Sequence, residues 1–204
     1  QHVTVVLNGD GGDELLGGYP RYDMTTFDRV AARYLPNGAQ ERLHSLLARV
    51  PPGLPGAGLL RHRLAGMIAP FSRAYLGRIC YFYPDEKERL YTPEFGETVR
   101  GHDSYDLLVR WFEEVPASDL LDRMLGVDTR SYLPDDLLVK VDRATMAHGL
   151  EARSPLLDHR LVEFAASLPV DLKVRHGRTK YLLKTAMRGI LPDRILDRDK
   201  MGFG

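Results

Sequence analysis

The sequence has little that would indicate a secreted, membrane-bound or nucleic-acid-binding protein. Its one cysteine, Cys80, cannot form a disulfide within the chain, which fits a reducing cytoplasm. Lysine plus arginine and aspartate plus glutamate each number 28, so charge gives no reason to expect nucleic acid or an anionic membrane as a partner. Neither a membrane-spanning apolar run nor a signal peptide is visible. We therefore expect a cytoplasmic protein.

The 204 residues are enough for one domain with a hydrophobic core, and the apolar spacing is mainly that of helices. Ser118 and Asp158 are expected to cap helices, and Pro134 is expected to open a helix that Gly149 ends. Residues 92–101 have no clear pattern. Further helices are predicted at 23–33, 41–50, 59–68, 73–81, 85–90 and 103–115, and from apolar stripes at 161–168 and 183–190.

A glycine-rich loop with three acids follows the one segment that we expect to be a strand. The run from Val3 to Leu7 predicts a buried strand, and Asn8-Gly9-Asp10-Gly11-Gly12-Asp13-Glu14 follows it. Such loops often hold phosphate, and because this loop has carboxylates and no lysine, phosphate would need a divalent cation such as Mg²⁺ between them. Ordinary turns explain part of the loop, but the whole run to Tyr19 favours a Mg²⁺-pyrophosphate or nucleotide site.

Two groups of charged residues occur later in the chain. Asp136, Lys140 and Arg143 share one face of an expected helix, where surface salt bridges are a sufficient explanation by themselves. Thr179 can cap a helix after a turn at 176–177, which would place Lys180 in its first turn, where a cation opposes the helix dipole. This position indicates either a nearby polyanion or a solvated basic surface.

Several ordered stretches resemble the glutamine-dependent asparagine synthetase family. Residues 8–14 and 17–22 are similar to its S-G-D/E-G-G/S-D-E loop and the G-G-Y-x-R-Y that follows. The most specific match is 132–158, which resembles Y-L-x-D-D-x-L-x-K-x-D-R-x-S/T-M-x-x-G-L-E-x-R-x-P-F/L-L-D. Residues 177–183 and 191–203 resemble G-x-S/T-K-x-I/L-L and L-P-x-x-I/L-x-x-R-x-K-x-G-F.

Two positions depart from the family pattern. Asn8 stands where the loop usually has serine, which keeps a polar side chain at that place. Ser154 stands where valine is commoner, a departure without an evident chemical consequence in the sequence.

The resemblance implies that residues 1–204 are the C-terminal portion of a synthetase domain with an α/β adenine-nucleotide α-hydrolase-like (ATP pyrophosphatase) fold. In this chain we expect mostly α-helix with one parallel strand near the N-terminus, whose partner strands would precede Gln1. The family also has a glutaminase domain and an S-G-G-x-D-S phosphate loop, which we likewise expect before Gln1. The chain alone is therefore expected to be inactive.

In such synthetases ATP activates aspartate as β-aspartyl-AMP with release of pyrophosphate, and ammonia from glutamine then displaces AMP. The resemblance thus implies ATP and Mg²⁺ as cofactors, and aspartate, ATP and ammonia as small-molecule substrates. It also implies the glutaminase domain of the same chain as a partner, without nucleic acid or membrane, and leaves a homodimer open.

The resemblance also assigns site residues. It implies that Asp10 and Lys180 are catalytic, with Lys180 stabilising the tetrahedral intermediate and pyrophosphate, and that Asp13 and Asp10 hold Mg²⁺. ATP or pyrophosphate is expected at Asn8, Gly9, Asp10, Gly11, Gly12 and Asp13. Further candidates for substrate or phosphate contacts are Asp142, Arg143, Glu151, Arg153 and Lys200.

Two alternatives remain at this point. A β-lactam-forming or peptide-cyclising synthetase shares the scaffold and adenylates another carboxylate, but Asp10 favours an asparagine synthetase, because the β-lactam enzymes have a tyrosine-like position there. The other alternative is a non-catalytic helical scaffold, against which the acids of the loop and Lys180 argue.

Overall fold

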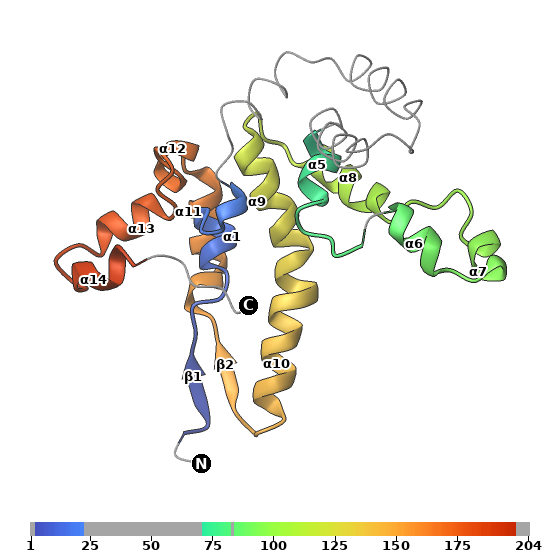
Figure 1. Ribbon diagram of the computed structural model, residues 1–204. Coiled ribbons are helices and arrows are strands. Elements are labelled where there is room, and N and C mark those ends of the chain that lie inside the picture. Colours follow the sequence, from blue (N-terminus) through green and yellow to red (C-terminus); the bar gives the residue numbers. More distant parts are fainter. Residues whose placement is uncertain (1–2, 23–70, 83, 199–204) are drawn as a thin grey trace. The chain divides into compact units, whose positions relative to one another are not determined.

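A computed structural model describes residues 3–22, 71–82 and 84–198 of the chain (Figure 1). The chain divides into two compact units, one made of Gln1–Asp23 with Ala117–Gly204 and the other of Met24–Pro116. The helices predicted at 23–33, 41–50 and 59–68 lie outside the described residues. We describe each unit by itself.

The first unit contains two strands that carry the glycine-rich loop, and a series of helices around them. Its α-helices and strands are β1 (Val5–Leu7), α1 (Gly12–Leu16), α9 (Leu120–Arg130), α10 (Val139–Met146), β2 (Glu151–Arg153), α11 (His159–Ser167), α12 (Val170–Lys173), α13 (Tyr181–Ala186) and α14 (Asp193–Leu196). Two 3₁₀ helices, η1 (Pro20–Tyr22) and η3 (Pro155–Leu157), and one π-helical segment, η2 (Leu133–Leu138), complete it.

β1 and β2 pair in parallel, although the whole second unit lies between them in sequence. Val5 is opposite Glu151 and Leu7 is opposite Arg153, and Figure 1 shows the two strands side by side. The prediction of a single strand in this chain is therefore wrong, because β1 pairs with β2, whereas partner strands before Gln1 stay a prediction. The sequence of β2, Glu-Ala-Arg, lacks the apolar and β-branched residues that would have indicated a strand.

The prediction that β1 is buried is also wrong. Leu7 is 73% exposed and Val5 is 40% exposed. The reason is that a sheet of two short strands is too small to have a covered face of its own. Of the two strands, α10 packs mainly against β2.

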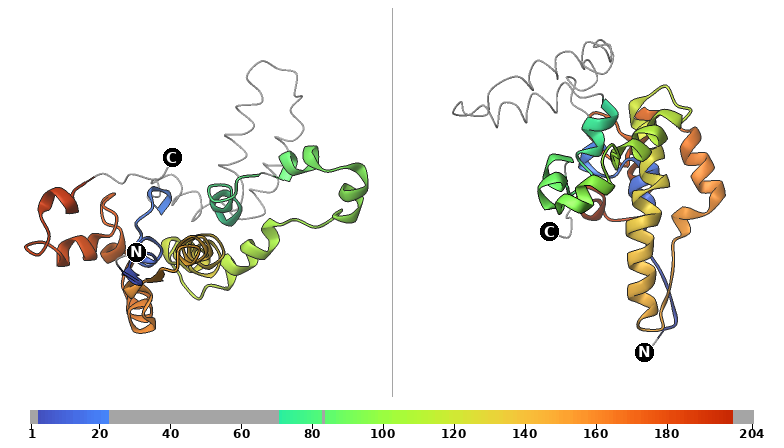
Figure 2. Two further views of the ribbon diagram at one scale, coloured as in Figure 1. Left: turned by 90° about the horizontal axis from the view of Figure 1, so that it is seen from below. Right: turned by 90° about the vertical axis from the view of Figure 1, so that its right-hand side faces the viewer.

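α9, η2 and α10 lie end to end as one long rod, with a turn at Ser131 between α9 and η2, and Figures 1 and 2 both show this rod beside the strands. As predicted, Pro134 lies in the first turn of a helical segment, η2, but this segment is π-helical and continues into α10. Proline has no N–H to donate, and the wider π-helical turn of η2 accommodates it within the rod. The rod starts one residue later than predicted, because Asp119 rather than Ser118 is the cap, accepting a bond from Leu121 N at 2.8 Å. Gly149 ends the helix as predicted, with a left-handed φ of 60°.

The buried face of α9 forms the centre of this unit. Leu121, Met124 and Leu125 are buried, as their spacing predicts, and Val127 joins them. Lys173 of α12 is only 2% exposed, and its ammonium donates to Asp122 of α9 at 2.6 Å. α12 is thus attached to α9 by an ion pair whose lysine is buried and whose aspartate is partly exposed.

The segment that follows α1 is anchored to α9 through Arg21 and Tyr22. The fully buried Asp128 accepts hydrogen bonds from Arg21 Nη2 at 2.7 Å and from the Tyr22 hydroxyl at 2.5 Å. The Arg21 guanidinium also lies 4.1 Å from the ring centroid of Tyr19 and 4.6 Å from that of Tyr132. This network explains why the resemblance at 17–22 includes an arginine between two tyrosines.

The second unit packs α5 (Phe71–Leu76) against α8 (Tyr105–Glu114), and α6 (Pro84–Leu90) and α7 (Pro93–Thr98) lie between them in sequence. Its described core includes Tyr75 and Phe112, whose ring centroids lie 6.3 Å apart. α5 ends earlier than the predicted helix at 73–81. α7 falls in the segment without a clear pattern, where Thr92 caps it by accepting a bond from Phe95 N.

Two further expectations concern the last helices. Asp158 caps α11 as predicted and accepts from Arg160 N at 3.0 Å, but Phe164, expected on the buried stripe, is 53% exposed. The stripe predicted at 183–190 is also wrong, because α13 stops at Ala186 and Gly189 has a φ of 81°. The described chain is thus mostly helical, as expected, with a small parallel sheet.

Within the described residues, no helix combines the length and apolar character that crossing a membrane requires.

The buried Arg21–Asp128 pair gives a stability prediction. Asp128→Asn should lower the free energy of unfolding by about 3 kcal/mol, because it leaves a largely buried guanidinium without its counter-charge. Urea denaturation of the full-length protein measures the change. The control Asp136→Asn, on an exposed carboxylate paired with Lys140, should cost less than about 0.5 kcal/mol. Equal effects of the two substitutions would contradict the anchoring role.

Candidate active site

The glycine-rich loop connects β1 to the short helix α1 and is held in a left-handed turn. Gly11 has a φ of 85°, and a Cβ there would lie 2.1 Å from Leu157 Cδ2, so this position needs glycine for both conformation and space. Gly12 N donates to Gly9 O at 3.3 Å, which uses one of the loop's N–H groups within the loop. α1 then ends at Gly17, whose φ is 68°.

Lys180 approaches the loop from the other end of the sequence. Its Nζ lies 3.0 Å from Asp13 Oδ1, and both side chains are about a quarter exposed (27% and 24%). The predicted turn at His176-Gly177 is confirmed: both residues have positive φ, and Arg175 and Arg178 exchange backbone hydrogen bonds across it. The structure thus brings together the two sequence regions from which the catalytic and metal residues were predicted.

The backbone of Lys180 differs from the prediction. Its φ of 52° and ψ of 38° place it in the left-handed region immediately before α13, so it is not in the first turn and Thr179 is not the cap. A non-glycine residue there costs about 1–2 kcal/mol, and such strain is often found at functional sites. The conformation directs a long cationic side chain back toward Asp13 of α1.

Gly18 is the reason that Asp13 and Lys180 can meet. A Cβ at Gly18 would lie 1.8 Å from Asp13 Oδ1 and 2.3 Å from Lys180 Cε. A larger residue would therefore occupy the place where the ion pair lies.

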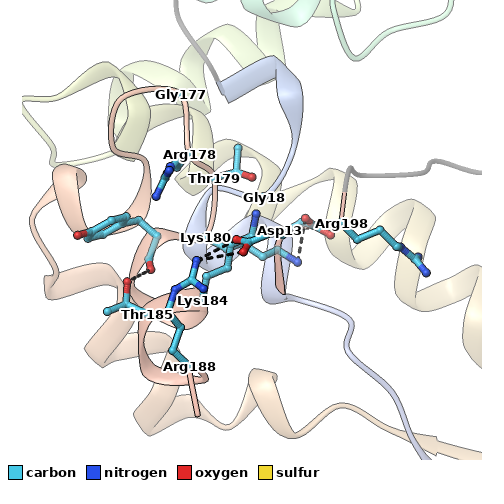
Figure 3. A pocket seen from close by; sticks show the side chains of 12 residues that line it. Asp13, Gly18, Gly177, Arg178, Thr179, Lys180, Lys184, Thr185, Arg188 and Arg198 are labelled. Atoms are coloured by element: carbon cyan, nitrogen blue, oxygen red, sulfur yellow. Dashed lines mark hydrogen bonds and ion pairs between the residues drawn. The ribbon is translucent and has the colours of Figure 1, made fainter. Parts of the chain in front are cut away.

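A cavity of about 670 Å³ opens beside this pair, and its lining is strongly cationic (Figure 3). Five cationic side chains face two carboxylates, those of Asp13 and Asp197. Arg188 is held at one side by Asp193 at 2.8 Å and Asp197 at 2.9 Å. The five cations are Arg178, Lys180, Lys184, Arg188 and Arg198, of which the sequence reasoning assigned only Lys180 to the site. An excess of positive charge in one cavity suits a polyanionic ligand.

Comparisons with known proteins identify the family of this chain. The family model described as asparagine synthase matches residues 1–204. The chain belongs to the asparagine synthase family. It is similar over its whole length to asparagine synthetase [glutamine-hydrolyzing] 1 of Bacillus subtilis (35% identity, 31% of that protein) and to a putative asparagine synthetase of Mycobacterium bovis (34% identity, 30% of that protein).

The asparagine synthetase of Gallus gallus is 44% identical over 75 residues, which are 35% of this chain and 13% of that protein. The chain thus spans about a third of the two bacterial relatives that match all of it. No solved structure matches.

Apart from Asp13 and Lys180, none of the described residues that the family resemblance suggested lines the cavity. Asp142 and Arg143 are exposed on α10, and Glu151 and Arg153 of β2 are exposed and bind each other at 2.8 Å. The main chain at Arg153 does contribute, since its carbonyl accepts from Asn8 N at 2.9 Å. Lys200 lies outside the described residues.

The donor groups fit a Mg²⁺ ion that arrives with phosphate. Within the described residues, no group of three or more histidine, cysteine, aspartate or glutamate side chains could hold a metal by itself. Mg²⁺ commonly takes only one or two carboxylates and completes its coordination with substrate phosphates and water. Asp13 lies on the lining of the cationic cavity, where one carboxylate would be enough for such an ion, and the assignment of Asp13 and Asp10 to Mg²⁺ remains a prediction.

A buried carboxyl, Glu14, lies next to Asp13. Glu14 is 1% exposed and accepts a hydrogen bond from the Tyr19 hydroxyl at 2.5 Å. Burial raises the pKa of Glu14 above its ordinary 4.5, against the opposing effect of this hydrogen bond. Burial and the same hydrogen bond also raise the pKa of Tyr19. The sequence reasoning treated Glu14 as one more acid of the loop, whereas the structure places its side chain in the core.

Substitution of Gly18 tests the close approach. Gly18→Ala should push the Asp13 and Lys180 side chains apart and weaken binding of Mg²⁺-pyrophosphate at least about tenfold, the size expected for losing a charge-assisted contact. Calorimetric titration of the full-length protein measures this. The control Gly96→Ala, on α7 where a Cβ meets no atom within 4 Å, should bind as the wild type does. Wild-type binding by Gly18→Ala would refute the role of Gly18.

The raised pKa of Glu14 gives a pH prediction. Burial of Glu14 favours its protonated form, so protonation contributes to the free energy of unfolding. This contribution is fully present below pH 4.5 and is lost as the pH rises through the higher pKa that Glu14 has in the folded protein. Glutamine does not titrate, so Glu14→Gln should not show this loss. Between pH 4.5 and the folded-state pKa of Glu14, its free energy of unfolding should rise relative to that of the wild type by up to about 1.4 kcal/mol per pH unit. Tyr19→Phe should extend the loss to higher pH, because the bond that lowers the pKa is gone. Urea midpoints measured across pH check both, and parallel curves for all three proteins would contradict the assignment.

Proposed function

We propose that the protein containing this chain is a glutamine-hydrolysing asparagine synthetase. It would convert aspartate, ATP and ammonia from glutamine into asparagine, AMP and pyrophosphate. The names of the bacterial and vertebrate relatives support this assignment, and the cationic cavity beside the Asp13–Lys180 pair is the observation that carries it.

The chemistry has two steps. An aspartate side-chain carboxylate oxygen attacks the α-phosphorus of ATP, the bond to the bridging oxygen breaks, and pyrophosphate leaves. Ammonia then attacks the carbonyl carbon of β-aspartyl-AMP, loses a proton, and displaces AMP. In the first step negative charge accumulates on the leaving pyrophosphate, so positioned cations stabilise the transition state more than the ground state.

The residues of the cavity suit the leaving group. Lys180 would donate its ammonium hydrogens to pyrophosphate, and its strained backbone fixes where the ammonium lies before the substrate arrives. Arg178 and Lys184 would add charge from the same side of the cavity. Gly9 and Gly11 keep the loop backbone free of side chains that would prevent a phosphate from approaching.

The carboxylates have a separate role. Asp13 would hold Mg²⁺ on the pyrophosphate, and when bound the ion neutralises charge on the phosphate oxygens. Asp10, in the same loop, would position the aspartate substrate or the metal. Asp13 contacts Lys180 and Asp10 accepts a hydrogen bond from Asn8, so both acids would be arranged by the protein before ATP binds.

Exchange of labelled pyrophosphate into ATP in the presence of aspartate tests the proposal, because it reports formation and reversal of the acyl-adenylate. Asp13→Asn and Lys180→Met should each reduce exchange by about 10²–10³-fold, the usual effect of removing one transition-state contact. Glutamine hydrolysis should continue in both variants.

Matched controls are Asp136→Asn and Lys140→Met, an exposed pair 3.7 Å apart on the rod. Both should retain wild-type exchange. Exchange near the wild-type rate in Asp13→Asn would exclude it from the site, and wild-type exchange driven by another carboxylic acid but not by aspartate would exclude asparagine synthesis.

A further inference from the structure

Three polar side chains outside the cavity lining form a chain of hydrogen bonds between the loop and β2. Because β1 and β2 are parallel and Leu7 pairs with Arg153, the next residues, Asn8 and Ser154, meet at the carboxyl ends of the two strands. Ser154 Oγ lies 2.5 Å from Asn8 Oδ1, and Asn8 Nδ2 lies 2.6 Å from Asp10 Oδ2. All three side chains are partly buried.

The donors and acceptors of these hydrogen bonds between Ser154, Asn8 and Asp10 have one consistent arrangement. A carboxylate only accepts, so the Asn8 amide must present its NH₂ to Asp10. Its Oδ1 is then the atom next to Ser154, and the hydroxyl must donate. Turning the amide over would place Oδ1 against the Asp10 carboxylate, so Asp10 fixes which way the amide faces, and Ser154 holds the amide oxygen by donating to it.

Asp10 is held at two points by this one amide. Besides the carboxylate contact, Asp10 N lies 3.4 Å from Asn8 Oδ1, the longer bond of an Asx turn. The position of the Asp10 carboxylate therefore depends on Asn8, and that of Asn8 depends on Ser154.

We infer that Asn8 and Ser154 act as one positioning unit for Asp10. The inference rests on the proposed function, in which Asp10 acts in acyl-adenylate formation. The two residues are the departures from the family pattern noted in the sequence, where serine and valine are usual at these positions. Valine at 154 could not donate to Asn8, so the two departures belong together and the serine has the chemical consequence that the sequence did not reveal.

A variant cycle in the full-length protein tests this interdependence. Ser154→Val alone should lower the kcat of aspartate-dependent pyrophosphate exchange about five- to tenfold, the effect of losing one hydrogen bond, with the KM for ATP and glutamine hydrolysis unchanged. Ser154→Thr keeps a hydroxyl and should remain near the wild type. The double variant Asn8→Ser/Ser154→Val restores the usual pair of residues and should recover exchange to within about twofold of the wild type.

Ser167→Ala is the matched control, since Ser167 Oγ donates to Phe164 O within its own helix. Ser167→Ala should leave the rate of pyrophosphate exchange unchanged. Full pyrophosphate exchange by Ser154→Val would overturn the inference. So would a double variant whose fold-loss of exchange is the product of the fold-losses of Asn8→Ser and Ser154→Val measured separately.

Hydrogen–deuterium exchange of residues 8–13 gives a readout that does not depend on activity. Ser154→Val should increase exchange of this loop, and Ser154→Thr should not. If the wild type shows no aspartate-dependent exchange of pyrophosphate, the proposed function fails, while the loop protection still decides whether Ser154 holds Asn8. Unchanged protection in Ser154→Val would overturn the positioning unit in that case too.

Discussion

The parallel pairing of β1 with β2 is the constraint on which the site depends. It joins residues 5–7 to residues 151–153 and so fixes the carboxyl ends of both strands at one edge. Asn8 and Ser154 are neighbours for this reason alone, and the loop that carries Asp10 and Asp13 starts from a fixed point. Without the pairing, the loop would be attached to the rest of the unit mainly at its other end, through α1 and the segment that follows it.

A second attachment sets the far end of the loop. Arg21 and Tyr22 bind the buried Asp128 of α9, and α1 lies between this anchor and β1. A helix of five residues held at both ends has little freedom, so the direction of Asp13 is determined by its surroundings. Lys180 reaches it from a tight turn with positive φ at His176 and Gly177, and strain in the Lys180 backbone completes the contact.

Much of this could be predicted from local signals. The glycine-rich loop, the turn at 176–177, the cap at Asp158 and the buried face of α9 all depend on neighbouring residues, and each is present as expected. The wrong predictions about β1 and Phe164 concern long-range matters: the partner and exposure of the strand, and the outward position of the aromatic side chain. Packing against distant segments decides these features, and local propensity does not record it.

The sequence by itself determined which groups can do chemistry here, namely the acids of the loop and Lys180, because residue type fixes charge and hydrogen-bonding capacity. Only the tertiary structure decided which of them meet. It brought Asp13 to within 3.0 Å of Lys180, gathered Arg178, Lys184, Arg188 and Arg198 around one cavity, and left Asp142 and Arg143 exposed on α10. The physical reason is that contacts between residues more than a hundred positions apart depend on strand register and helix packing, which no short stretch of sequence encodes.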